Sequence, residues 1–185
     1  RLVADHNLLT SIDLHFDDFE MPSMDLSYNN LTSFTVEPLQ FPGYEDINLS
    51  HNQLTSLTLG GSIYQINVSQ HPLTVLDLNG SFTKSLNVSY TSLSSITGAG
   101  TLKYANFQNC QFTELDLTNV SFYWPNGGST IDLGNNPVDK VIFGASSPGS
   151  LTYSSTNSSF DLANFHGSDY CRYHWQLEQE GNVRI

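Results

Sequence analysis

Asparagine in Asn-x-Ser/Thr sequons has the most evident chemistry in this sequence, because such sequons accept N-linked glycans in secreted proteins. Four sequons fall where turns or loops are expected and are the better candidate acceptors: Asn30, Asn79, Asn119 and Asn157. Three more belong to a recurring Leu-x-Leu-Ser type of motif, which contains a sequon whenever its second residue is Asn: Asn48, Asn67 and Asn87. Two interpretations stay open, glycosylated acceptors or unmodified polar positions.

Residues that could catalyse a reaction or hold a metal ion form no recognisable constellation. The carboxylates Asp17, Asp18 and Glu20 cluster, but they lack the D-x-D-G type of loop that calcium binding requires. The sequence contains no nucleophile elbow, phosphate-binding loop or Gly-rich dinucleotide turn. None of the histidines pair at metal-ligand spacing: His6, His15, His51, His71, His166 and His174. Two carboxylates on neighbouring repeats could reach the separation for glycoside cleavage, but nothing selects such a pair. We therefore predict no enzymatic activity, cofactor or metal site.

Charge and cysteine content narrow the classes of partner. The 185 residues carry a formal charge of −12, from 18 acidic and 6 basic side chains, which repels phosphate backbones and anionic lipid surfaces. No apolar run approaches the ~18–20 residues needed to span a bilayer. Cys110 and Cys171 make neither a disulfide framework nor a metal spacing. We therefore expect no nucleic-acid partner and no membrane-spanning segment. Cys171 either pairs with a cysteine outside this chain or remains unpaired. Because Arg1 lies directly inside a repeat, any leader is expected to be removed or to lie outside this segment.

An internal repeat predicts the fold. The pattern L-x-L-x-x-N-x-L-x-x-L-x-L fits seven windows, which begin at Leu2, Met24, Ile47, Ile66, Leu86, Ala105 and Ile131. Only Ala105 and Gly98 are weak apolar members of this pattern. All variation in repeat length falls after the second L-x-L, as expected of stacked coils with one loop edge.

Each L-x-L is expected to form a short strand with two side chains inward and one outward. Such a coil cannot bury its apolar face alone, so it stacks on neighbours about 4.8 Å away. The sequence predicts an all-β solenoid of about seven to eight coils with two short parallel sheets. The amide at the N position should bond backbone groups of its own and the adjoining turn: Asn7, Asn29, Asn52 and Asn136, with His71, Thr91 and Cys110 as replacements.

The repeat resembles the leucine-rich-repeat proteins, in the short variant that has a second L-x-L in place of a helix. The segment Asn52–Leu57 is similar to repeats of internalin-type bacterial surface adhesins. The resemblance covers residues 2–143, with a degenerate eighth coil around Leu151 to Leu162. It implies an interaction scaffold at the cell surface or outside the cell. The cysteine ladder of one subgroup is absent, since only Cys110 occupies the Asn position.

One outward row of the first sheet is a candidate ligand face. It contains Asp25, Asn48, Asn67, Asn87, Asn106 and Asp132, with Tyr28, His51 and Tyr90 as an aromatic edge. The row could bind a protein or a glycan, or it could be solvated strand surface with structural value. A row of threonines before the second strand resembles an ice-binding surface, but it fails at Asp139.

The C-terminal segment differs from the repeats. Alternation in Cys171–Leu177, a turn signal and the pair Val183 and Ile185 predict a β-hairpin with one apolar face. We therefore divide the chain into a solenoid (1–162) and a C-terminal cap, or a hairpin that leads to another domain or subunit (163–185). The expected function is extracellular recognition or adhesion. The alternative is a structural glycoprotein subunit that stacks end to end into a filament, since the first coil shows no cap.

Overall fold

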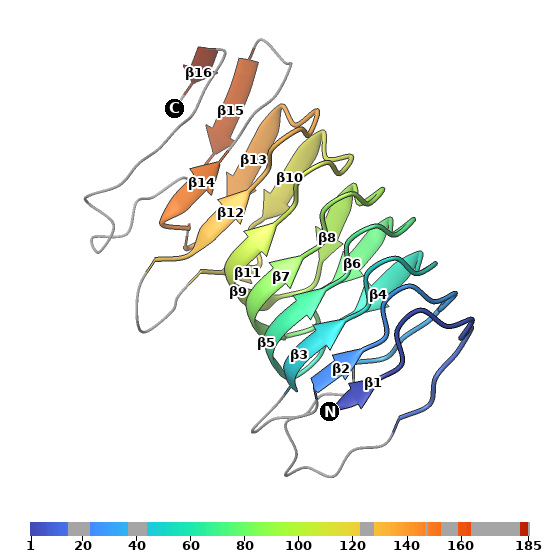
Figure 1. Ribbon diagram of the computed structural model, residues 1–185. Helices are drawn as coiled ribbons and strands as arrows, with labels where there is room; N and C mark the ends of the chain where they lie inside the picture. Colours follow the sequence, from blue (N-terminus) through green and yellow to red (C-terminus); the bar gives the residue numbers. More distant parts are fainter. Residues whose placement is uncertain are drawn as a thin grey trace.

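The structure is a computed structural model, and it describes residues 1–14, 23–36, 44–122, 128–146, 148–152, 159–163 and 182–184. In these residues the chain is all β, with parallel strands stacked into a rod, as the repeat predicts (Figure 1). No described segment is a helix long and apolar enough to cross a membrane.

The first L-x-L segments form one wall of the rod. It is a nine-stranded sheet that contains β1 (Leu2–Val3), β2 (Ser23–Asp25), β3 (Tyr44–Asn48), β5 (Ser62–Asn67), β7 (Phe82–Asn87), β9 (Gly100–Asn106), β12 (Thr130–Asp132) and β14 (Ser150–Thr152), with β11 (Val120–Ser121) beside the start of β9. The expected repeat starts lie opposite one another, for example Met24 with Ile47 and Ile47 with Ile66. Leu151 continues this register after Ile131, so the first strand of the degenerate eighth coil belongs to the same wall.

The second L-x-L segments form the opposite wall, which is divided into two sheets. One contains β4 (Ser56–Thr58), β6 (Val75–Asp77) and β8 (Ser95–Thr97), and the other contains β10 (Glu114–Leu117), β13 (Lys140–Phe143), β15 (Ser159–Ala163) and β16 (Asn182–Arg184). The division follows Gly98, a position where other repeats place an apolar side chain. Gly98 has a φ of 72°, and a Cβ there would collide with the Asp77 carboxylate. A side chain that anchors the neighbouring turns is therefore missing between β8 and β10.

Complete turns with a strand in both walls run from the β3/β4 pair to the β14/β15 pair, which gives about six. In the first two repeats, the described residues 11–14 and 31–36 of the second wall form no strand. The two-walled region is therefore shorter than the seven to eight coils that the sequence indicates.

The core lies between the walls. Leu26, Leu49 and Val68 are fully buried, as are Leu76 and Leu115 across from them. Phe107 and Phe112 meet edge to face, with ring centroids 5.7 Å apart. Each Leu or Ile buried in this way contributes ~1.5–3 kcal/mol, so stacking of repeats supplies the main stabilising free energy.

The described part of the C-terminus continues the second wall. β16 pairs in parallel with β15, with Val183 opposite Phe160. The other arm of the expected hairpin, Cys171–Leu177, lies outside the described residues. Most of the expected cap segment 163–185 lies outside them too.

Candidate ligand face

The outward row predicted from the sequence forms a series of identical turns, which we call the Asx row: Asp25, Asn48, Asn67, Asn87, Asn106 and Asp132. In each case the side-chain Oδ1 accepts a hydrogen bond from the backbone N–H two residues later, at 2.9–3.2 Å. The Ser27 and Ser50 hydroxyls donate to the same oxygens and are buried. These bonds fix the side-chain orientation along the whole row.

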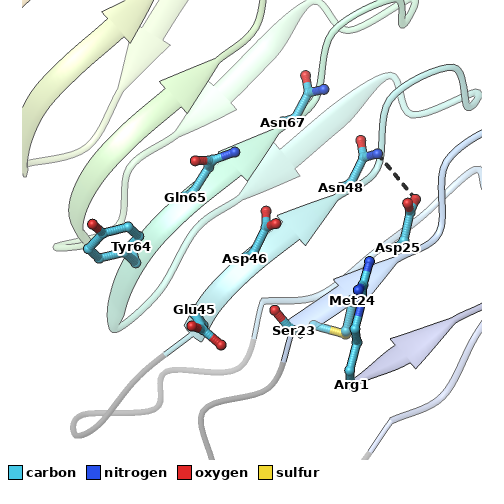
Figure 2. Close-up of a pocket in the computed structure, with 10 residues that line it drawn as sticks. All are labelled: Arg1, Ser23, Met24, Asp25, Glu45, Asp46, Asn48, Tyr64, Gln65 and Asn67. Atoms are coloured by element: carbon cyan, nitrogen blue, oxygen red, sulfur yellow. Dashed lines mark hydrogen bonds between the residues drawn. The ribbon is translucent and has the colours of Figure 1, made fainter.

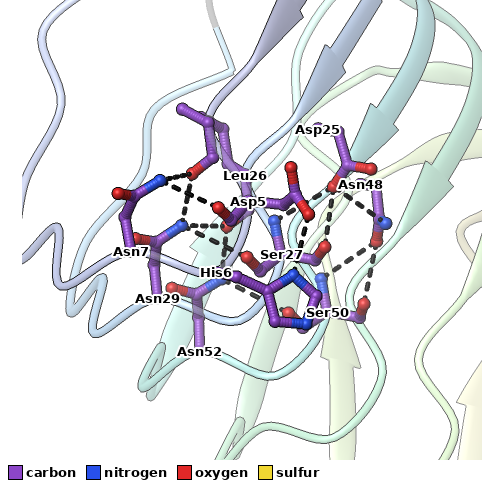
Figure 3. A network of polar contacts seen from close by, with 11 residues as sticks. Asp5, His6, Asn7, Asp25, Leu26, Ser27, Asn29, Asn48, Ser50 and Asn52 are labelled. Carbon is purple, nitrogen blue, oxygen red and sulfur yellow. Dashed lines mark hydrogen bonds and ion pairs between the residues drawn. The ribbon is translucent and has the colours of Figure 1, made fainter.

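Because Oδ1 is occupied by the turn, the amide nitrogen is the group that each Asn presents outward. The Asn48 amide donates to Asp25 at 3.1 Å (Figure 3). The Nδ2 groups of Asn67, Asn87 and Asn106 have no hydrogen-bond partner among the described residues. Adjacent strands place these three donors about 4.8 Å apart. The arrangement presents oriented donors to any acceptor-bearing ligand.

A hollow of about 610 Å³ lies over the N-terminal part of this face (Figure 2). Its lining includes the carboxylates of Asp25, Glu45 and Asp46, with the side chains of Arg1 and Tyr64. Desolvation, followed by the neighbouring Asp25 charge, raises the pKa of Asp46, and Arg1 opposes that effect. The N-terminal end of the face therefore carries negative charge, which the Arg1 side chain partly offsets.

A second hollow, of about 370 Å³, lies over β5, β7, β9 and β12. It is lined by polar groups of the Asx row and by Gln65, Ser85 and Tyr104. Tyr64 and Phe82 are exposed on neighbouring strands, and Lys84 Nζ lies 3.6 Å from the Tyr64 ring centroid. The repeat pattern could not reveal these aromatic residues, because Tyr64 and Phe82 lie in the stretch where repeat length varies. Their alternation with inward Ile63 and Thr83 was the available signal.

A ladder of inward polar side chains supports the face from behind. Asn52 Nδ2 donates to Leu26 O at 2.9 Å (Figure 3). It also donates to Leu49 O at 2.8 Å, and its Oδ1 accepts from Leu31 N. Asn29 and Asn136 make the corresponding bonds, each to its own turn and to the preceding one. Asn7 is exposed and bonds only within its own repeat, to Ala4 O and Asp5 O.

His71 replaces Asn in this ladder and joins its own turn to the preceding one. Its Nε2 lies 2.7 Å from Leu49 O and its Nδ1 3.1 Å from Leu54 N. Because Nδ1 accepts from a backbone N–H, Nε2 carries the proton and the ring is neutral. Desolvation lowers the pKa of His71 from 6.5 to about 4.

Two shorter side chains, Thr91 and Cys110, continue the ladder. Both donate to Val88 O, at 2.9 and 3.3 Å. Desolvation raises the pKa of the Cys110 thiol, so this cysteine is a structural group and a poor nucleophile. Cys171 lies outside the described residues.

Tyr28, His51 and Tyr90, expected as an aromatic edge, occupy the corner after the first strand. They share a left-handed conformation with all residues at this position of the repeat: His6, Tyr28, His51, Gln70, Tyr90, Asn109 and Asn135. The rings of His6, Tyr28 and His51 stack with centroids 4.3 and 4.1 Å apart. Stacking of planar groups offsets part of the ~1–2 kcal/mol cost of each left-handed residue. The first three corner residues are thus held by one another.

The sequons differ in the state of their acceptor amides. Asn30 and Asn119 are exposed and their amides have no described partner. The Asn79 amide donates to Leu59 O, and the Asn48 amide donates to Asp25. Asn67 and Asn87 lie within the Asx row, and Asn157 lies outside the described residues.

Within the described ranges, no three His, Cys, Asp or Glu side chains converge as metal ligands. His15, His166, His174, Asp17, Asp18 and Glu20 lie outside these ranges. No protein-family model, curated protein or solved structure matches the chain.

Proposed function

We propose that this chain is a leucine-rich-repeat recognition or adhesion module that works outside the cell or at its surface. Its ligand, a protein or a glycan, binds the outward face of the nine-stranded sheet. The observation that carries this proposal is the row of oriented amides at Asn67, Asn87 and Asn106, whose nitrogens have no partner in the part of the chain that the structure describes.

Orientation of these donors lowers the cost of binding. Ordering a flexible side chain at an interface costs ~0.5–1.5 kcal/mol, and here the turn has already fixed each Asn side chain. A ligand that satisfies all three donors therefore gains hydrogen bonds at ~0.5–1.5 kcal/mol each with little loss of side-chain entropy. The extracellular part of the proposal is supported by the sequons and by the likeness of the repeat to surface adhesins.

The Asx row also supplies a variant that removes a donor and keeps the fold. Asp25 and Asp132 make the same turn as the asparagines, so Asn87→Asp keeps the acceptor oxygen and loses the amide. The variant exchanges an outward donor for an acceptor.

A photo-crosslinking residue at Ser85, on this face, tests the proposal against one at Thr58, on the opposite wall. Both proteins are incubated with intact cells and extracellular matrix. We expect adducts from position 85, and we expect the additional Asn87→Asp change to lower their yield about three- to tenfold at subsaturating protein concentration. Equal yields from the two positions, or an unchanged yield with Asn87→Asp, would contradict the proposal.

A further inference from the structure

The central strands of the face leave a ligand only side chains to contact. β5, β7 and β9 are each paired on both sides in the nine-stranded sheet, so their backbone groups are used in the ladder. An extended peptide cannot add as another strand here. Recognition must use the outward side chains of these three strands.

Those side chains combine aromatic rings with amide donors. Tyr64 on β5 and Tyr104 on β9 are 52% and 39% exposed and lie within one residue of the same level of the sheet, whereas Phe82 on β7 lies two residues before the level of Tyr64. The Asn67 and Asn106 amides follow three and two residues after these tyrosines on the same face, and the Asn87 amide lies between them on β7. Sugar rings match both features, because their C–H faces stack on aromatic rings and their oxygens accept amide hydrogen bonds.

The charge around this patch selects among sugars. Carboxylates bound it on both sides, Glu45 and Asp46 near β5 and Asp132 beyond β9. Lys84 Nζ lies 3.6 Å from the Tyr64 ring centroid and holds that ring by a cation–π contact, so a sugar can stack only on the ring surface that Lys84 leaves exposed. With a chain charge of −12, a polyanionic glycan is repelled and a neutral one is not.

We propose that the face formed by β5, β7 and β9 binds a neutral, unbranched glycan that stacks on Tyr64 and Tyr104 and accepts hydrogen bonds from the Asn67, Asn87 and Asn106 amides. The glycan crosses the strands, because the three donors repeat from strand to strand at a spacing close to the length of one sugar ring. This inference rests on the proposed function and adds the ligand class to it.

Calorimetric titration of the full chain with cellohexaose, laminarihexaose and hexagalacturonate tests this inference. We expect a neutral hexasaccharide to bind and the anionic one to bind more weakly. Loss of one hydrogen bond corresponds to about three- to tenfold in affinity, so Asn87→Asp should weaken binding by about that factor. Tyr104→Ala should weaken it at least as much.

Two control variants make the same kinds of side-chain change at positions outside the β5, β7 and β9 face. Tyr90→Asn removes an exposed aromatic from the corner, where Asn109 and Asn135 already adopt the same left-handed conformation. Asn30→Asp changes an exposed amide off the sheet face. Both should bind like the unmodified protein.

The outcomes distinguish an error in the proposed ligand class from an error in the proposed binding face. If neither neutral hexasaccharide binds while Ser85 still cross-links to a protein in an Asn87-dependent manner, the glycan inference is wrong and the proposed face stands. If glycan binding is unaffected by both Asn87→Asp and Tyr104→Ala, the inference about this face is also wrong. Stronger binding of hexagalacturonate than of the neutral sugars would overturn the charge argument.

Discussion

Replacement of His71 by Asn should remove a specific part of the acid sensitivity of this protein. His71 is 5% exposed and neutral in the ladder, and burial lowers its pKa from 6.5 to about 4. Above pH 6.5 neither the folded nor the unfolded chain protonates this ring, so it contributes no pH dependence there. As the pH falls from 6.5 to 4, the unfolded chain binds a proton that the folded chain does not, and stability declines.

The size of this effect follows from the pKa difference. Each pKa unit corresponds to ~1.4 kcal/mol, so a fall from 6.5 to about 4 costs the folded state about 3 kcal/mol by pH 4. Asn occupies the same ladder position at Asn52 and Asn136, where it makes the equivalent bonds. His71→Asn should therefore fold and should lack this loss.

Urea unfolding at several pH values between 7.5 and 4 measures the effect. The difference in free energy of unfolding between the two proteins should shift by about 3 kcal/mol in favour of the variant, since other carboxylates titrate alike in both. Gln70→Asn, an exposed change at the adjacent residue, is the matched control and should follow the unmodified protein. Parallel pH profiles for the unmodified protein and His71→Asn would refute the reasoning.

Three further predictions concern the ladder and the sequons. Thr91→Asn should stabilise the fold by about 1 kcal/mol, because an amide oxygen there can accept from the Leu73 N–H, as Asn52 Oδ1 accepts from Leu31 N, whereas the Thr91 hydroxyl accepts from Leu93 N in its own turn; an unchanged or lower urea midpoint would count against it. Cys110 should resist alkylation in the folded protein, because its thiol is buried and its pKa is raised, and peptide mass spectrometry after iodoacetamide treatment measures this; rapid labelling without unfolding contradicts it. After secretion from a eukaryotic host, Asn30 should carry glycan and Asn48 should not, because the Asn48 amide is bonded to Asp25; glycopeptide mapping that finds the reverse would show that these amide contacts do not govern modification.

Much of the fold could be predicted from the sequence because a single physical rule generates it. Alternation in L-x-L decides which side chains face inward, and an identical spacing in each repeat then brings Ile47, Ile66 and Leu86 into register. Gly98, a weak member of the apolar pattern, marks in the sequence the place where the second wall divides. Its effect on pairing between β8 and β10 depends on a close approach to Asp77 that no sequence pattern shows.

The candidate site was predictable in part. The Asx row is visible as Asn or Asp followed two residues later by a small or polar residue, but the turn bonds that direct its amides outward are features of the structure. The left-handed corner position has no consensus residue, because His, Tyr, Gln and Asn all occur there and share only a planar side chain. Tyr64 and Phe82 lie outside the constant part of the repeat, so alignment of repeats cannot place them.

Amide NMR of the unliganded chain tests most directly whether the outward row presents free donors while the inward row is bonded. The side-chain amide hydrogens of Asn52 and Asn136 should exchange slowly with solvent, because each has buried backbone acceptors in two turns. Those of Asn67, Asn87 and Asn106 should exchange fast and show contacts from each residue to the next along the row. Slow exchange at Asn87, or the absence of contacts between Asn87 and its two neighbours, would contradict the account.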